Sequence, residues 1–289
     1  MNILLLGGTG YLASQLIPLL DSLESVEQCV CTQRAITSSN VKGLLSDKIS
    51  FIQADYENIE RCMQRIHFDW IINTVGSYSR GTLFCDSSLE SNLMFPIKIL
   101  NYAALHEVPN YMTIGTALPD DFDVYSFSKA LFAECGMFFA SKCKINFYNL
   151  KLQMFYGPHE PRERFLPMCI EKLYHNEPLL LTAGTQKRDI IYIKDICGVI
   201  IHILTMEKYT QNGYLQIPVG TGCESSLREI VEYLKAMMGS ESELYFGAVP
   251  MRPNEPDCIA DTTMLNKLGY NIQYEWKAGL RELIDIEYG

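Results

Sequence analysis

Short apolar segments alternate with amphipathic segments along the first half of the chain. The apolar segments are continuous, which is typical of strands that are covered on both faces in a parallel sheet. They span residues 2–6, 26–32, 49–54, 70–75, 111–116 and 145–152. Helical periodicity is found between them, in residues 11–23, 57–66, 88–106 and 125–142. This alternation predicts an α/β fold with a Rossmann-type, doubly wound parallel sheet.

The pattern becomes less regular after residue 157, in a polar, proline-rich loop. Three helical segments and a second loop rich in proline and charge follow, in residues 165–175, 194–206, 226–238 and 249–257. We find no repeat, low-complexity tract or flexible linker. We therefore expect residues 1–157, with about 186–220, to form the Rossmann domain. Residues 158–185 and 221–289 are expected to form a smaller, interleaved C-terminal substrate lobe.

Composition and charge are those of an ordinary globular protein. The chain has 289 residues, is 48% hydrophobic, and carries a net charge of −10, which argues against broad nucleic-acid binding. Its ten cysteines show no CxxC pair and no cluster with histidine, so we expect buried thiols and no metal site. No apolar stretch reaches about 18 residues and no leader precedes the first strand, which favours a cytoplasmic protein without a membrane span.

The glycine-rich turn after the first strand matches the dinucleotide-binding fingerprint in its GxGxxA form, from Gly8 through Gly10 to Ala13. In this pattern Gly8 makes the tight turn, Gly10 lets the backbone approach a pyrophosphate, and Ala13 is small enough for helix–strand packing. The following helix N-terminus adds N–H donors and a partial positive charge. A turn with only a structural role is the alternative. The predicted cofactor contacts here are Gly7, Gly8, Thr9, Gly10, Tyr11 and Leu12.

The end of the second strand bears on the type of cofactor. An acid about 20 residues after the glycines usually binds the free ribose 2′-hydroxyl of NAD. This chain has no acid there but has Arg34, whose guanidinium suits a 2′-phosphate, with Ser38 or Ser39 as an added hydroxyl. The sequence therefore favours NADPH over NADH, with a solvated surface arginine as the alternative.

Further cofactor contacts are expected where the next strands end. Asp55 follows the third strand, where its carboxylate can accept a bond from the adenine amino group or cap the next helix. Tyr56 lies beside it, and Thr74 and Val75 end the fourth strand.

Thr116, Tyr125 and Lys129 form a candidate catalytic trio. Thr116 ends the fifth strand, and Tyr125 and Lys129 share a helix face because they are four residues apart. An ammonium near a tyrosine favours the phenolate, and Lys129 can also bond the nicotinamide ribose. The trio suits hydride transfer at a carbon that bears oxygen, with Tyr125 moving the proton and Thr116 orienting the oxygen. Asn92, on the preceding helix, is expected to brace the surroundings of Lys129, or else to be a polar helix residue.

These motifs together resemble the extended short-chain dehydrogenase/reductases of the nucleotide-sugar group, the NAD-dependent epimerase/dehydratase family. The resemblance covers nearly the whole chain and includes GGTGYLA, Thr116 with the Tyr125-x-x-x-Lys129 pair, FYGP, QKRDIIYIKD and RPNEP. Ala13 replaces the third glycine of the family, and the interval from Thr116 to Tyr125 is shorter than in sugar epimerases. The resemblance implies a nucleotide-linked sugar as substrate.

The resemblance also implies a type of reaction. Sugar 4,6-dehydratases carry Asp-Glu after the threonine, where this chain has Ala117-Leu118, so dehydration is not expected. The chain looks most like the CDP-paratose and CDP-abequose synthase branch of 4-ketoreductases. We therefore expect NADPH-dependent reduction of a CDP- or dTDP-linked 4-keto-deoxyhexose, in deoxysugar and O-antigen-type biosynthesis. A 4-epimerase with tightly held NAD and a non-catalytic NADP-binding sensor remain the alternatives.

Substrate contacts and assembly are likewise implied by the resemblance. Arg188 and Arg252 would hold the diphosphate, unless Arg188 pairs with Asp189 or Asp195 and Arg252 is merely exposed. The other expected substrate contacts are Tyr78, Ser79, Thr116 and Phe155. Related enzymes often pair the two helices expected in 88–106 and 125–142 across a dimer, so a homodimer is expected by analogy.

Overall fold

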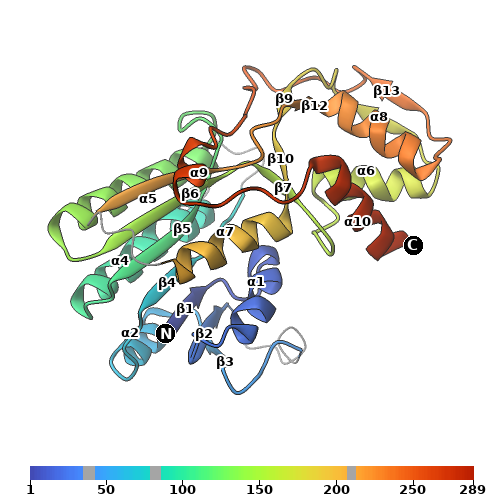
Figure 1. The fold of residues 1–289 in the computed structure, drawn as a ribbon. Coiled ribbons are helices and arrows are strands. Elements are labelled where there is room, and N and C mark those ends of the chain that lie inside the picture. The colour runs from blue at the N-terminus through green and yellow to red at the C-terminus, as the bar shows by residue number, and fades with distance from the viewer. Residues whose placement is uncertain (35–42, 79–85, 207–212) are drawn as a thin grey trace. The chain divides into compact units, whose positions relative to one another are not determined.

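The computed structural model describes residues 1–34, 43–78, 86–206 and 213–289 (Figure 1). The chain forms two compact units. The first contains Met1–Lys151 and Cys197–Ile217, and the second contains Leu152–Ile196 and Pro218–Gly289. The expected division gave residues 186–196 to the Rossmann domain, whereas in the structure they group with the second unit.

A seven-stranded sheet forms the centre of the first unit. Its strands are β1 (Asn2–Leu6), β2 (Gln28–Gln33), β3 (Ile49–Gln53), β4 (Trp70–Asn73), β5 (Asn110–Thr116), β6 (Asn146–Leu152) and β11 (Tyr214–Val219). Their order is β11-β6-β5-β4-β1-β2-β3, and β1 pairs in parallel with both β2 and β4. Leu5 thus lies opposite Cys31 on one side and Ile72 on the other. The doubly wound fold is confirmed, with β11 as a strand that the apolar pattern did not predict.

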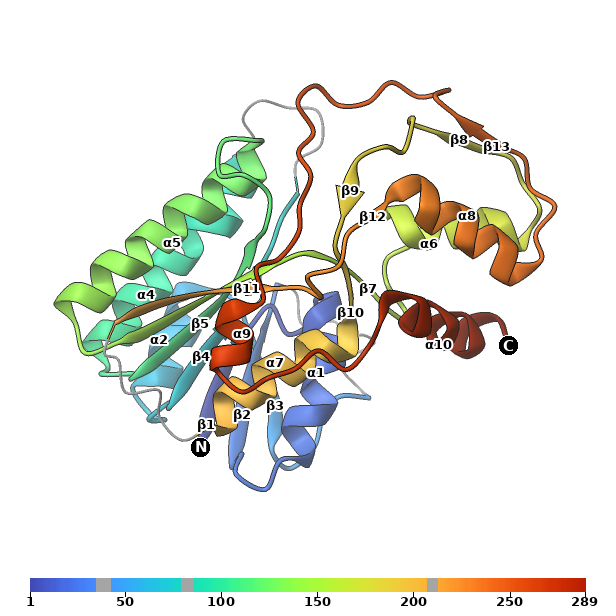
Figure 2. The same ribbon diagram turned by 45° about the horizontal axis from the view of Figure 1, so that its top comes forward.

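Helices cover both faces of this sheet (Figures 1 and 2). α2 (Tyr56–Met63), α4 (Phe95–Leu105) and α5 (Val124–Lys142) lie on one face. α1 (Tyr11–Ser22) lies on the other, together with α7 (Ile193–Thr205). The order of strands reverses between β1 and β4, and ligands of such sheets bind at the carboxyl ends of the strands beside this point.

The single helix expected in residues 88–106 is instead three consecutive segments. They are α3 (Asp86–Leu89), a π-helical turn η1 (Glu90–Met94) and α4. In the π-turn the Phe95 N–H bonds the carbonyl of Glu90, five residues earlier. Pro96 follows at once and has no N–H for the carbonyl of Asn92, so the α-helical ladder is interrupted there. Such π-turns are frequent at functional sites.

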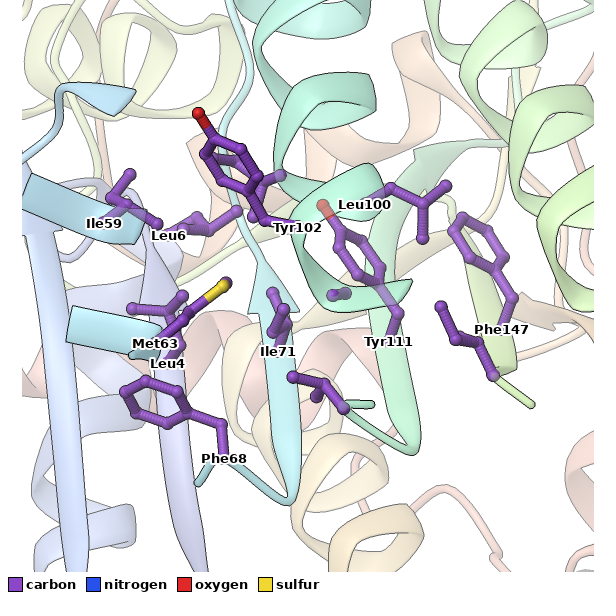
Figure 3. Packing of buried hydrophobic residues seen from close by; sticks show 14 of the residues in the cluster. Leu4, Leu6, Ile59, Met63, Phe68, Ile71, Leu100, Tyr102, Tyr111 and Phe147 are labelled. Atoms are coloured by element: carbon purple, nitrogen blue, oxygen red, sulfur yellow. The ribbon is translucent and has the colours of Figure 1, made fainter. Parts of the chain in front are cut away.

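The core of the first unit lies between the sheet and helices α2, α4 and α5. Figure 3 shows Leu4 and Ile71 of the strands close to Met63 of α2. Tyr111 and Phe147 stack at the other end of the cluster, with ring centroids 5.4 Å apart and planes inclined by 7°. This burial of large apolar side chains holds the strand ends that carry the candidate site.

The second unit is built from short strand pairs and helices. β7 (Met154–Tyr156) pairs with β10 (Ile190–Tyr192), β8 (Leu179–Leu181) with β13 (Leu244–Phe246), and β9 (Lys187–Arg188) with β12 (Ser225–Ser226). The helices are α6 (Phe165–Tyr174), α8 (Leu227–Met238), α9 (Thr263–Lys267) and α10 (Trp276–Tyr288).

Two buried carboxylates hold the loops of the second unit. Asp189 accepts bonds from the backbone N–H groups of Thr221, Gly222 and Ala260. Asp195 accepts bonds from the N–H groups of residues 273 and 274. In the part of the chain that the structure describes, no helix has the length and apolarity needed to cross a bilayer.

Candidate active site

The glycine loop after β1 adopts a conformation that its sequence only partly predicted. Gly7 has φ +83°, the left-handed region that favours glycine, so Gly7 makes the tight turn that was expected of Gly8. Gly8 has a packing role, since a Cβ there would lie 2.7 Å from the Cβ of Cys31. Gly10 N–H bonds the carbonyl of Gly7 at 2.9 Å and closes the turn.

The backbone donors of this loop divide into two groups. The N–H groups of Gly7 and Gly8 bond the hydroxyl and carbonyl of Thr32, at 3.0 and 2.8 Å, and so fix the loop to β2. α1 begins next, with Gly10 as its N-cap and no side chain capping it. If Gly10 carried a Cβ, the Gly7 carbonyl oxygen would be its one neighbour within 4 Å among the described residues, at a distance of 3.2 Å. The start of α1 can therefore receive an anion, as a pyrophosphate requires.

A pocket of about 500 Å³ opens beside this loop. It is lined by Gly7, Thr9, Gly10, Thr32, Gln33, Arg34, Ala54, Asp55, Tyr56, Thr74, Val75, Gly76, Ser77, Glu90, Ser91 and Phe95. Eight of the predicted cofactor contacts lie in this set, from Gly7 to Val75. Its size and the glycine cradle fit the adenosine and pyrophosphate of a dinucleotide. The sequence did not point to Glu90 or Phe95, because the π-turn that brings them to the pocket was not foreseen.

Asp55 and Tyr56 form one wall of the pocket. Asp55 caps α2, with Oδ1 accepting from Asn58 N at 2.7 Å and Oδ2 from Asn58 Nδ2 at 2.6 Å. Tyr56 stacks on Phe95 at 5.8 Å between centroids and donates its hydroxyl proton to Glu90 at 3.0 Å. Desolvation and the bond to Glu90 raise the pKa of the Tyr56 phenol to about 12. Both residues are therefore held in place without a ligand.

The Tyr125–Lys129 pair lies in the first turns of α5. A capping box between Asp123 and Ser126 starts this helix, which places Tyr125 in its first turn. Lys129 is only 6% exposed, and its Nζ donates to the carbonyls of Val75 at 2.7 Å and Ile114 at 2.9 Å. Burial lowers the pKa of the Lys129 ammonium to about 8. The lysine thus ties α5 to the ends of β4 and β5.

Thr116 and Asn92 complete this part of the site. Thr116 is the last residue of β5, and its hydroxyl accepts a bond from Leu118 N at 3.3 Å. Asn92 is buried and forms two bonds with the backbone of Ser77, at 2.8 and 2.9 Å, and a third with Ser128 Oγ at 3.1 Å. Asn92 therefore braces the strand-end loop beside Lys129 and is not a surface helix residue.

The remaining predicted first-unit contacts are Tyr78 and Ser79. Tyr78 stacks on Tyr125, with ring centroids 4.0 Å apart. This pairing could not be predicted, because 47 residues separate the two tyrosines in the chain. Ser79 lies outside the described residues.

Phe155, Arg188 and Arg252 belong to the second unit. Arg188 is buried, and its Nη2 lies 2.5 Å from Glu255 Oε1, so the alternative pairing with Asp189 or Asp195 is wrong. Arg252 is exposed. The guanidinium of Arg164 lies over the Phe155 ring at 4.9 Å.

Known proteins resemble this chain over most of its length. The profile of the NAD dependent epimerase/dehydratase family matches residues 3–217. CDP-abequose synthase of Salmonella typhimurium is 26% identical over 292 residues, covering 96% of this chain and 95% of the relative. CDP-abequose synthase of Salmonella muenchen is 24% identical, covering 99% and 98%. The structure of UDP-glucuronic acid 4-epimerase from Bacillus cereus, in complex with UDP-glucuronic acid and NAD, has a TM-score of 0.86 at 21% identity, covering 99% of this chain and 98% of that chain.

Proposed function

Because the chain belongs to the NAD dependent epimerase/dehydratase family, we propose that it reduces the 4-keto group of a CDP- or dTDP-linked deoxyhexose with NADPH. The observation that carries the proposal is the placement of Tyr125 and Lys129 in the first turns of α5. There the Lys129 ammonium is anchored on the carbonyl of Val75, which lines the pocket, and on the carbonyl of Ile114 in β5. The CDP-abequose synthases, similar over nearly the full length, support a deoxysugar nucleotide as substrate.

The proposed chemistry assigns one task to each member of the trio. NADPH supplies the hydride when it is bound. Tyr125 donates its phenolic proton to the C4 oxygen as that oxygen gains charge, and Thr116 holds the oxygen by a hydrogen bond. Lys129 has two of its three N–H donors on backbone carbonyls, which leaves the third for the nicotinamide ribose. Its positive charge stabilises the phenolate that remains after proton transfer.

The preference for NADPH rests on the pocket wall at the end of β2. Thr32, Gln33 and Arg34 line it there, and none of them carries a carboxylate for a free 2′-hydroxyl. Arg34 supplies a planar, permanently charged group for a 2′-phosphate. Asp55 would accept a bond from the adenine amino group in addition to capping α2.

Arg188, Arg252, Phe155, Tyr78 and Ser79 are proposed as substrate contacts. The ion pair between Arg188 and Glu255 sets a condition for this role. A diphosphate that binds Arg188 must either displace the Glu255 carboxylate or share the guanidinium with it. Arg252 is exposed and therefore needs no such exchange.

A homodimer through α4 and α5 is also proposed. Both helices, with the π-turn before α4, expose large apolar side chains, among them Met94, Leu105, Phe127, Met137 and Phe138. An apolar surface of this kind is typical of a protein–protein contact. A dimeric mass by light scattering at micromolar concentration would support this assembly, and a monomeric mass would contradict it.

A 4-epimerase is the second candidate, because the epimerase from Bacillus cereus shares the fold closely. A matrix of NADPH and NADH against CDP-, dTDP-, GDP- and UDP-4-ketosugars separates the candidates. Net oxidation of NADPH with one nucleotide series supports the reductase. When the corresponding nucleotide-linked 4-hydroxy sugars are supplied instead, interconversion of C4 epimers without net consumption of cofactor would support the epimerase. Tight NADP binding without turnover of any member would indicate a sensor.

A further inference from the structure

Tyr78 covers the proposed proton donor from the solvent side. Its ring stacks on that of Tyr125, with centroids 4.0 Å apart and planes inclined by 25°. Tyr125 is 6% exposed, whereas Tyr78 is 58% exposed. Tyr78 therefore shields one face of the Tyr125 ring from water.

The backbone that presents Tyr78 is held by buried polar side chains. Asn92 bonds both the N–H and the carbonyl of Ser77, the residue before Tyr78. The same Asn92 Nδ2 donates to Ser128 Oγ at 3.1 Å, and Ser128 Oγ donates to the carbonyl of Tyr125 at 2.8 Å. One buried amide thus connects the residue before Tyr78 to the helical turn that carries Tyr125.

A second anchor lies three residues before Tyr78. Lys129 Nζ donates to the carbonyl of Val75 at 2.7 Å. Val75 is thus bonded to α5 directly, and Ser77 is connected to it through Asn92 of η1. The segment that leads to Tyr78 therefore has two attachments to buried side chains, at Val75 and at Ser77. The attachments fix the position of Tyr78 relative to the helix on which the proposed proton transfer depends.

We propose that Tyr78 is a positioning residue, whose ring orients the Tyr125 phenol and keeps it neutral and ready to donate a proton. This inference rests on the proposed function. The physical reason is solvation: a phenolate needs water or a cation beside it, and the stacked ring removes water from one face. Lys129 acts in the opposite sense, because its ammonium favours the phenolate. The ring stack and the ammonium together set the balance between the neutral donor and the phenolate left after transfer.

Three other charged groups on the described elements around this turn are engaged elsewhere. The Asp123 carboxylate caps α5 by accepting from Ser126 N. Glu90 of η1 accepts the proton of Tyr56, and Lys98 of α4 lies over the Tyr56 ring at 5.7 Å. Among the residues that the structure describes, changes of Tyr78 and Lys129 are therefore expected to alter the ionisation of Tyr125.

The pair Tyr78→Phe and Tyr78→Leu tests the proposal, because the first keeps the ring and the second removes it. For reduction, activity falls at high pH as Tyr125 ionises. We expect Tyr78→Phe to keep the basic limb of the kcat profile at its wild-type position, because the ring is retained, whatever it changes in the KM for substrate. We expect Tyr78→Leu to lower kcat about tenfold and to move the basic limb of the kcat profile about one pH unit lower, with NADPH affinity unchanged. An unmoved limb in Tyr78→Leu would overturn the proposal, as would equal losses in both variants.

A spectroscopic titration makes the test independent of the substrate. The ¹³Cζ resonance of Tyr125 can be assigned in tyrosine-labelled protein by its loss in Tyr125→Phe. Its titration midpoint should fall in Tyr78→Leu and stay in Tyr78→Phe, and an unchanged midpoint in Tyr78→Leu would refute the role of the ring. A shifted midpoint in a protein that turns over no 4-ketosugar would support the inference and count against the proposed function alone.

Discussion

Replacement of Lys129 by methionine separates the energetic cost of this lysine from its function. Burial lowers its pKa from 10.5 to about 8, which corresponds to a cost of about 3 kcal/mol to the folded state at neutral pH. Methionine removes that cost but leaves the carbonyls of Val75 and Ile114 without their donor, at about 1–3 kcal/mol each. The two effects oppose each other, so the stability of Lys129→Met at pH 7 should lie between about 1 kcal/mol above and about 3 kcal/mol below that of the wild type. Turnover should fall at least ~100-fold.

The pH dependence of the free energy of unfolding, compared between the wild type and Lys129→Met, gives a sharper test. Between about pH 8 and 10.5 the folded wild type binds fewer protons at Lys129 than the unfolded chain, so its free energy of unfolding rises with pH. Relative to Lys129→Met, the wild type should gain about 2 kcal/mol between pH 7 and pH 9.5. Urea unfolding of both proteins at both pH values measures this, because the other groups cancel in the difference. Equal pH dependence of the two proteins would refute the buried-ammonium argument.

Three further predictions address the cofactor, the core and the second unit. Arg34→Ala should weaken NADPH binding about 10–100-fold and NADH binding little, by fluorescence titration; equal losses would remove the 2′-phosphate assignment. Tyr111→Phe should raise the free energy of unfolding by about 1 kcal/mol, because the Tyr111 hydroxyl is buried without a hydrogen-bond partner among the described residues. Tyr156→Phe is the matched control and should lower it by about 1 kcal/mol, because that hydroxyl donates to a backbone carbonyl at 2.9 Å; the same sign in both would contradict the reasoning. Glu160→Gln should stabilise the protein at pH 8 by up to about 3 kcal/mol but not at pH 4.5. Burial raises the Glu160 pKa to about 7, so relative to the variant the wild type should lose stability as pH rises from about 4.5 to 7. A difference between the two proteins that stays constant over this range in urea unfolding would contradict this assignment.

The sheet was predictable wherever strands are buried on both faces. β1 and β4 are continuous apolar segments, and hydrophobic pattern alone identifies them. β11 was missed because it is an edge strand with half-buried positions and Pro218, where neither pattern nor propensity is strong. The π-turn before α4 was missed because the periodicity continues through Pro96, although its backbone bonding does not.

The residue types of the candidate site could be predicted from the sequence, but their backbone conformation and their long-range partners could not. The fingerprint identified the glycine loop, but spacing contains no information on φ, and the left-handed residue is Gly7. The partners that fix Arg188 and Tyr125 lie 67 and 47 residues away in the chain, at Glu255 and Tyr78. Such pairs depend on the folded topology, which a local pattern does not specify.

Isotope transfer is the most direct test of hydride delivery from NADPH to the sugar. Wild-type protein is given NADPH that carries deuterium as the transferred hydrogen on C4 of the nicotinamide. The substrate is the CDP- or dTDP-linked 4-ketosugar that the matrix of cofactors and 4-ketosugars selects. We expect one deuterium at C4 of the sugar for each NADPH oxidised, and loss of most turnover with intact NADPH binding in Tyr125→Phe. Product without deuterium at C4, or full activity of Tyr125→Phe, would contradict the proposed reduction.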